Sequence, residues 1–135
     1  MCIRDSANSE AGAVRLVIGA DHGGVELKDG IVRYLNELKL DVLDVGTDGT
    51  ESVDYPDYAQ AVAEQIQLGK RDLGILCCNS GIGMSIAANR HMGIQAAVVT
   101  DPEEAALTRE HNNCNVMCLG AVSYTHLTLP TTPYV

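Results

Sequence analysis

Phenylalanine and tryptophan are absent from the 135 residues, so tyrosine, with five copies, is the only large aromatic residue. The chain therefore has little aromatic surface on which nucleic-acid bases could stack. Basic residues are also scarce, because nine Lys and Arg stand against eighteen Asp and Glu and give a formal net charge of −9. A nucleic acid or an anionic membrane surface requires a basic face. We expect a small molecule or a protein as the partner, with no nucleic acid and no membrane, and any anion must be held locally.

The sequence also lacks long apolar runs and a regular cysteine framework. No segment approaches the length that crosses a membrane, and the N-terminus has no apolar core of a secretory signal. The five cysteines are odd in number, and none forms a Cys-x-x-Cys pair, which argues against disulfides and against a structural zinc site. We therefore expect reduced thiols, no metal and a cytoplasmic protein. The cysteines are Cys2, Cys77, Cys78, Cys114 and Cys118.

Two terminal segments differ from the rest of the chain in composition. Residues 1–6 read MCIRDS, and residues 123–135 read SYTHLTLPTTPYV, where the preceding pattern favours another helix. Both resemble translated adapter sequence at the edges of assembled DNA, and a natural disordered tail is the alternative. We expect these ends to be non-native, and a single domain over residues 14–121.

Between the ends, apolar strands alternate with helices. The helices are predicted at 27–38, where Leu27, Ile31, Leu35 and Leu38 form an apolar stripe, at 58–68, at 84–90, and after Asp101, whose neighbours suit a capping box. Residues 46–57 predict a long exposed loop. Strands are predicted at 15–20, 41–46, 73–78, 94–100 and 115–120, the fourth covered on both faces. These repeated units predict an α/β fold, a three-layer α/β/α sandwich around a five-stranded parallel sheet, Rossmann-like in class.

Ligands of such sheets bind beyond the carboxyl ends of the strands. Unusual polar residues gather there in the prediction, and we group with them two residues that close the helix before the last strand. The expected set is Asp21, His22, Tyr55, Cys78 to Gly83, Thr100 and Asp101, together with His111 and Asn112.

The segment CCNSGIGMSIAANR, residues 77–90, carries the strongest chemical signal. A helix N-terminus presents free N–H groups and partial positive charge, so NSGIG offers a nest for an oxyanion or a phosphate. Such a nest would favour the thiolate of Cys78, which could then act as a base. The alternative is a buried cysteine that acts only as a small apolar residue, and this reading suits Cys77 best.

Each of the other candidates also has a purely structural interpretation. Asp21 could cap the first helix, and His22 could bond a backbone carbonyl. Tyr55 could pin the loop beside Pro56, and His111 with Asn112 could form a helix C-cap. Their convergence with a thiol and an anion nest favours a functional site.

Four motifs in register resemble the ribose-5-phosphate isomerase B family, which is related to the galactose-6-phosphate isomerase subunits. They are GADHGG (19–24), DYPDYA (54–59), GILCCNSGIGMSIAANR (74–90) and REHNNCNVMCLGA (109–121). The resemblance covers residues 14–121. It implies a cofactor-independent and metal-independent aldose-ketose isomerase, which interconverts ribose 5-phosphate and ribulose 5-phosphate in the pentose phosphate pathway through an enediolate.

The resemblance also implies roles for single residues. Cys78 would move the proton between C1 and C2, and Ser80 would assist transfer between the sugar oxygens. The backbone of Asn79, Gly81, Ile82 and Gly83 would stabilise the enediolate. His111 with Asp21 would open the sugar ring, Tyr55 and Asn112 would line the sugar, and His22 would contact the phosphate. The family pattern further implies a homodimer with shared active sites, in which His111 and Asn112 face the Cys78 site of the other subunit. A dimer of dimers is an alternative.

The sequence departs from the family in two places. Some members carry a glutamate shortly after the glycine loop, where this chain has Met84, Ser85 and Ile86, so it belongs to the cysteine type. Val122 stands where the family has an arginine after LGA, and the C-terminal helix is missing. We therefore expect the chain as given to fold but to be poorly active. Alternative functions are isomerisation of allose, galactose or tetrulose phosphates, a non-catalytic sugar-phosphate-binding subunit, and a receiver-like signalling domain.

Overall fold

The computed structural model describes residues 14–46 and 55–121. The predictions for residues 1–6, for Val122 and for 123–135 lie outside these residues. All five predicted strands are present, and each predicted helix has a counterpart. The elements in chain order are β1 (Arg15–Ala20), the 3₁₀ helix η1 (His22–Gly24), α2 (Val25–Glu37), β2 (Asp41–Asp44), α3 (Tyr55–Gln67), β3 (Leu73–Cys78), α4 (Ile82–Asn89), β4 (Ala96–Val98), α5 (Pro102–Asn112) and β5 (Val116–Gly120).

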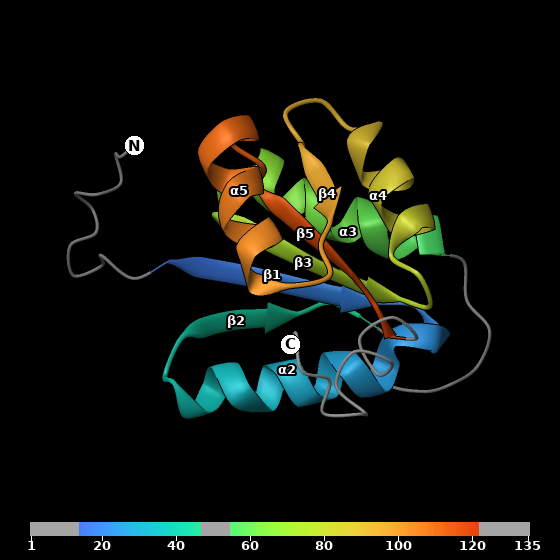
Figure 1. Cartoon of the computed structure of the whole chain (residues 1–135). Helices are drawn as coiled ribbons and strands as arrows, with labels where there is room; N and C mark the ends of the chain where they lie inside the picture. The colour runs from blue at the N-terminus through green and yellow to red at the C-terminus, as the bar shows by residue number, and fades with distance from the viewer. Residues whose placement is uncertain (1–13, 47–54, 122–135) are drawn as a thin grey trace.

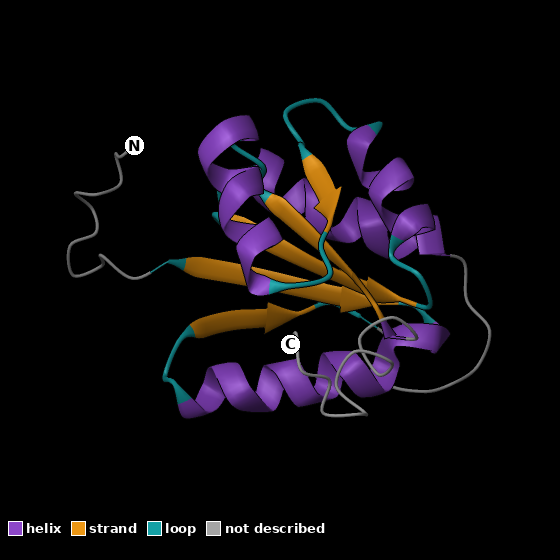
Figure 2. Cartoon of the chain, viewed as in Figure 1, coloured by secondary structure: helices purple, strands orange, loops and turns teal. Residues whose placement is uncertain are grey.

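The five strands form one sheet in the order β2-β1-β3-β5-β4, and every neighbouring pair is parallel (Figure 1). Helices α3 and α4 cover one face, and α2 and α5 cover the other (Figure 2). Each face has its own buried cluster, centred on Val62, Leu76 and Met84 under α3 and α4, and on Ile18, Ile75 and Leu119 under α2 and α5. The predicted three-layer α/β/α sandwich is confirmed.

Several element boundaries differ from the sequence prediction by one to three residues, and three differences affect burial or the site. Helix α3 begins at Tyr55, three residues earlier than predicted, so Tyr55 belongs to a helix rather than to the loop. Strand β4 is shorter than predicted, and its three side chains are only half-buried because it lies at the sheet edge. Leu38, predicted as part of an apolar stripe, is 51% exposed because it lies at the C-cap of α2, past the last packed turn.

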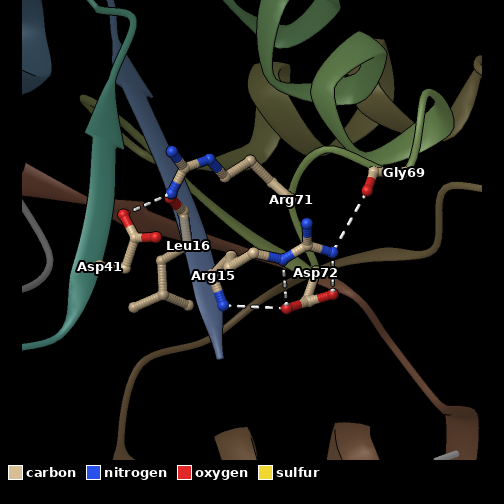
Figure 3. Close-up of polar contacts among 6 residues, drawn as sticks. All are labelled: Arg15, Leu16, Asp41, Gly69, Arg71 and Asp72. Carbon is tan, nitrogen blue, oxygen red and sulfur yellow. Dashed lines mark hydrogen bonds and ion pairs between the residues drawn. The ribbon is translucent and has the colours of Figure 1, made fainter. Parts of the chain in front are cut away.

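Ion pairs between charged side chains connect the strands at the amino edge of the sheet (Figure 3). The Arg15 guanidinium makes a two-pronged contact with Asp72, with Nη2 to Oδ1 at 2.9 Å and Nε to Oδ2 at 3.2 Å. Arg71 Nη1 donates to Asp41 Oδ1 at 2.8 Å and to the carbonyl of Leu16 at 3.3 Å. Exposed ion pairs contribute about 0–1 kcal/mol each. Their effect here is to hold β1, β2 and the start of β3 in register. These ion pairs lie at the amino edge of the sheet, away from the carboxyl ends of the strands.

Candidate active site

The carboxyl ends of β1, β3 and β5 meet at one place on the sheet. Ala20 is level with Cys77, and Cys78 is level with Gly120. The segments that follow these strands therefore start side by side, and the N–H of Asp21 donates to the carbonyl of Cys77 at 3.3 Å. This arrangement brings the Asp21–His22 turn next to the Cys78 loop, as the sequence predicted.

The turn after β1 is held tightly against the end of β3. Asp21 is buried at 8% exposure, and its Oδ1 accepts the N–H of Gly23 at 2.9 Å, so it caps η1. A Cβ at Gly24 would lie 2.4 Å from the backbone carbonyl of Cys77, so only glycine permits this contact. His22 points away from the core and is exposed. The turn thus presents a fixed carboxylate and an accessible imidazole at the carboxyl edge.

The Cys78 thiol lies where β3 enters its loop. Cys78 is 6% exposed, and its Sγ accepts the N–H of Gly81 at 3.1 Å. Gly81 has φ +85°, a left-handed conformation that favours glycine, and it caps α4 without a side-chain bond. A Cβ at Gly120 would lie 2.6 Å from the carbonyl of Ser80, so the loop packs directly on β5. The Gly81 N–H thus fixes the sulfur of Cys78 at the start of α4.

The other two fully buried cysteines are poor candidates for a base. Burial raises the pKa of Cys77 from 9.0 to about 12, and burial also raises the pKa of Cys118. Cys77 faces α2 and α5, whereas Cys78 faces α3 and α4. The sequence prediction that adjacent strand residues point to opposite faces, and that Cys77 is a packing residue, is confirmed.

Helix α4 begins at this loop and presents backbone N–H groups to the same edge. Ser80 is exposed, and its Oγ accepts the N–H of Ile82 at 3.2 Å. In the part of the chain that the structure describes, the N–H groups of Gly83 and Met84 have no acceptor, as expected for the first turn of a helix. These two donors and the helix dipole make the edge suitable for an anion or a developing oxyanion.

Thr100 and Asp101 also lie at the carboxyl edge, but both have structural partners. Asp101 Oδ1 accepts the N–H of Glu104 at 2.8 Å and caps α5. Glu104 Oε1 accepts the Thr100 N–H at 2.7 Å and the Thr100 hydroxyl at 2.8 Å. The Asp101 half of the predicted capping box is therefore confirmed, whereas the glutamate side chain bonds Thr100 instead of the N–H of Asp101.

His111 and Asn112 do not join the site within one chain, so the prediction that they lie on the same rim as Cys78 was wrong. They end α5, and the chain then enters β5, whose Val116 is level with Gly74 while its Gly120 is level with Cys78. They therefore lie at the amino edge, a strand length away from the thiol, and both are exposed. The physical reason is that a helix between parallel strands runs back across the sheet, so its C-terminus reaches the opposite edge. For Tyr55, the structure describes only the backbone.

Sequence reasoning missed a charged residue beneath the carboxyl edge. Lys28 is 1% exposed, and its Nζ bonds Asp44 Oδ2 at 2.8 Å and contacts Asp29 Oδ1 at 3.3 Å. Burial alone would lower the pKa of Lys28, but the bonds to Asp44 and Asp29 outweigh it and raise that pKa. The only signal in the sequence is that Lys28 stands three residues after Val25, on the buried side of α2.

The described residues show no alternative centre for the chemistry. In residues 14–46 and 55–121, no three His, Cys, Asp or Glu side chains are grouped so that they could hold a metal ion. An apolar groove between α5 and the sheet lies at the amino edge, lined by residues such as Leu16, Arg109 and Cys114, away from Cys78. No helix in these ranges has the length and apolar character needed to span a bilayer.

Comparison with known proteins identifies the family. The sequence profile of the Ribose/Galactose Isomerase family matches residues 16–128. Ribose-5-phosphate isomerase B of Escherichia coli (strain K12) is 45% identical over 107 residues, which cover 79% of this chain and 72% of that protein.

Solved structures agree with this match. Ribose-5-phosphate isomerase B of Clostridium thermocellum superposes with a TM-score of 0.80 at 46% identity, over 82% of this chain and 74% of that chain. The Mycoplasma genitalium protein of the same name, solved with bound ribulose-5-phosphate, gives a TM-score of 0.76 at 39% identity, over 81% of this chain and 73% of that chain. The chain therefore belongs to the ribose/galactose isomerase family and is an enzyme of the isomerase class.

Proposed function

We propose that this protein interconverts ribose 5-phosphate and ribulose 5-phosphate, with Cys78 as the base. The observation that carries the proposal is the bond from the Gly81 N–H to Cys78 Sγ at 3.1 Å, at the start of α4 and beside Asp21. The thiolate removes the proton from C2 of the aldose, the enediolate forms, and the same proton returns to C1 to give the ketose. The reaction requires no net gain or loss of electrons.

The loop can stabilise the enediolate with its own groups. The Gly81 and Ile82 N–H groups already serve Cys78 Sγ and Ser80 Oγ, whereas the N–H of Gly83 is open in the described structure. An oxyanion next to this helix start is stabilised by preorganised donors. The Ser80 hydroxyl, exposed beside it, moves the proton between O1 and O2. In the same proposal the backbone of Asn79 helps to stabilise the enediolate, and the exposed His22 contacts the phosphate.

Ring opening is assigned to Asp21 and His111, with Asn112 and Tyr55 against the sugar. Since His111 and Asn112 lie at the opposite edge of the sheet, they can reach a substrate bound beside Cys78 only from a second copy of the chain. The proposal therefore includes a homodimer with shared sites. Mixing Cys78→Ala and His111→Ala proteins should restore part of the activity after subunit exchange, and a complete lack of rescue with exchange confirmed would contradict the shared site.

The direct test of the function is an isomerase assay with ribose 5-phosphate, allose 6-phosphate, galactose 6-phosphate and a tetrulose phosphate. The assay should include the 135-residue chain and a version that carries the Escherichia coli relative's segment after Ala121, because the sequence predicts residues 123–135 to be foreign. Conversion of ribose 5-phosphate is the expected result. If neither version converts any of the four compounds, the proposed function is wrong.

Cys78 and Cys77 provide a matched pair for the mechanism. Cys78→Ala should lower kcat by roughly a hundredfold to ten-thousandfold, the range expected when a general base is lost. Cys77→Ala removes an adjacent, equally buried thiol that faces the other side of the sheet, so kcat should stay within about threefold. A Cys78→Ala enzyme that keeps a tenth or more of the activity would show that another group is the base.

The proposal places the enzyme in the cytoplasm and in pentose phosphate metabolism. The thiols of Cys77, Cys78, Cys114 and Cys118 are all free, which suits a reducing compartment. We further propose residues 14–121 as the isomerase domain.

A further inference from the structure

Asn79, the residue directly after Cys78, places its side chain on the neighbouring turn. A Cβ built on Gly23 would lie 2.5 Å from Asn79 Oδ1, 2.8 Å from its Cγ and 3.0 Å from its Nδ2. All three atoms of the carboxamide are therefore close to the Cα of Gly23, and the amide occupies the space that a side chain at position 23 would take. The carboxamide bridges the Asp21–His22 turn and the Cys78 loop.

The hydrogen-bonding groups of this carboxamide are not used by the fold. Within the described ranges, Asn79 Oδ1 and Nδ2 have no hydrogen-bond partner, and the residue is exposed at the carboxyl edge. Two other asparagines show the contrast. Asn89 bonds both the N–H and the carbonyl of Ala96, and Asn115 bonds the N–H of Gln95 and the carbonyl of Gly93. Those two carboxamides hold neighbouring segments together through backbone hydrogen bonds. The Asn79 carboxamide instead offers one acceptor and two donors at the site.

We propose that the Asn79 carboxamide is a specificity-determining group that hydrogen-bonds a hydroxyl of the phosphosugar, and that Gly23 is required because it leaves room for it. The inference rests on the proposed function and extends it, since that function uses only the backbone of Asn79. A sugar hydroxyl is both donor and acceptor, and a carboxamide matches either role. A side chain that reads a hydroxyl discriminates among substrates, because a misplaced hydroxyl leaves a polar group unpaired.

The test is a double-mutant cycle on Gly23 and Asn79, read as kcat/KM for ribose 5-phosphate and for allose 6-phosphate. Asn79→Gly should lower kcat/KM for ribose 5-phosphate about tenfold to a hundredfold, the range for one hydrogen bond to substrate. The ratio between the two substrates should change by about fivefold or more. Asn79→Asp keeps the shape but adds a negative charge near a phosphate ester, so KM should rise.

Gly23→Ala alone should resemble Asn79→Gly, because the new methyl group displaces the carboxamide. The N–H of residue 23 that donates to Asp21 Oδ1 remains, so the cap of η1 is retained. In the Asn79→Gly background, Gly23→Ala should cause little further loss, and this non-additivity is the specific signature of the contact. Gly30→Ala, in α2 with no atom within 4 Å of the new Cβ, is the matched control and should leave activity unchanged.

Three results would overturn the inference. Asn79→Gly could change both substrates equally or not at all, or Gly23→Ala could cost the same in both backgrounds. Any of these three results in an active parent enzyme refutes the role of the carboxamide and leaves the isomerase function standing. A parent protein that converts no phosphosugar refutes both. Thermal unfolding of each variant identifies losses that come from unfolding rather than from the site.

Discussion

Replacement of Lys28 tests whether a buried cation stabilises the segments that lie beneath the candidate active site. Lys28 lies in the first turns of α2, is 1% exposed, and bonds Asp44 at the end of β2 at 2.8 Å. Asp44 Oδ1 in turn accepts the N–H of Gly46 at 2.9 Å, and a Cβ at Gly46 would lie 2.6 Å from the backbone nitrogen of Ala20. The Lys28–Asp44 pair therefore ties α2 and the end of β2 to the last residue of β1, next to Asp21.

The magnitude follows from the exposure of the partners. Removing one member of a fully buried ion pair costs about 3–5 kcal/mol, because the other charge is left without compensation. Here the Asp44 side chain is 32% exposed and keeps its bond to the Gly46 N–H, so water can solvate it in part. We therefore expect Lys28→Met, which retains the length of the apolar stem, to cost about 2–3 kcal/mol. In a domain of this size, that loss lowers Tm by roughly 8–20 °C.

Asp29→Asn is the matched control, because Asp29 contacts the same ammonium at 3.3 Å but its side chain is 52% exposed. That substitution should cost about 0–0.5 kcal/mol. Urea unfolding at pH 7 measures both changes. Since the pKa of Lys28 is raised in the folded state above its ordinary 10.5, its contribution is fully present at pH 7 and decreases as the pH rises through the raised value. A Lys28→Met protein within 0.5 kcal/mol of the parent, by the exposed-pair scale, would refute the reasoning.

Three further predictions concern the loop, the sheet edge and alkaline stability. Gly81→Ala should destabilise the protein by about 1–2 kcal/mol, because φ is positive at this position. It should also lower kcat, because the new Cβ lies 3.2 Å from the carbonyl carbon of Leu119 beside the Cys78 loop. Gly69→Ala, with φ +75° and open space around the new Cβ, should cause a similar loss in unfolding experiments without the kinetic effect. Asn89→Ala removes both bonds to Ala96 at 2.7 and 3.0 Å and should cost about 1–2 kcal/mol, with faster amide exchange in β4 as the readout. Burial raises the pKa of Cys77 from 9.0 to about 12 and also raises that of Cys118. The stability that depends on these two thiols should therefore be constant well below pH 9 and fall above it by about 1.4 kcal/mol per pH unit for each thiol. Cys77→Ala should roughly halve that slope between about pH 9 and 10.5, and an unchanged slope in denaturant titrations would contradict the assignment.

The parts of the fold that were predicted well from the sequence are those that depend on residues close together in the chain. The strand Leu73–Cys78 was predicted to the residue, because its apolar run is bounded by Asp72 and by the turn residues Asn79 and Ser80. The Asp101 cap follows from one residue type at one position, and Gly69, two residues past the end of α3, takes the left-handed conformation that favours glycine. In each case the deciding interactions are between neighbours in the chain.

The features that escaped prediction depend on contacts between distant segments. Lys28 is buried because Asp44, sixteen residues later, lies beside it once β2 pairs with β1. The contact of Asn79 with Gly23 requires β3 to lie beside β1. No short stretch of the sequence predicts the strand order β2-β1-β3-β5-β4, so this contact could not be predicted. The half-burial of β4 has the same origin, since only the strand order shows that it is an edge strand.

His111 shows how topology constrains a functional assignment that rests on motif resemblance. The motif REHNNCNVMCLGA places His111 a few residues from Cys118 in the chain, and Cys118 is two positions from the level of Cys78. Parallel pairing nevertheless separates them, because the chain must cross the length of β5 to travel from one edge to the other. If His111 takes part in catalysis, each complete site needs two chains, with the carboxyl edge of one facing the amino edge of the other. The subunit-mixing experiment therefore tests a consequence of strand direction, and it can be read once Cys78→Ala and His111→Ala have each been shown to be inactive alone.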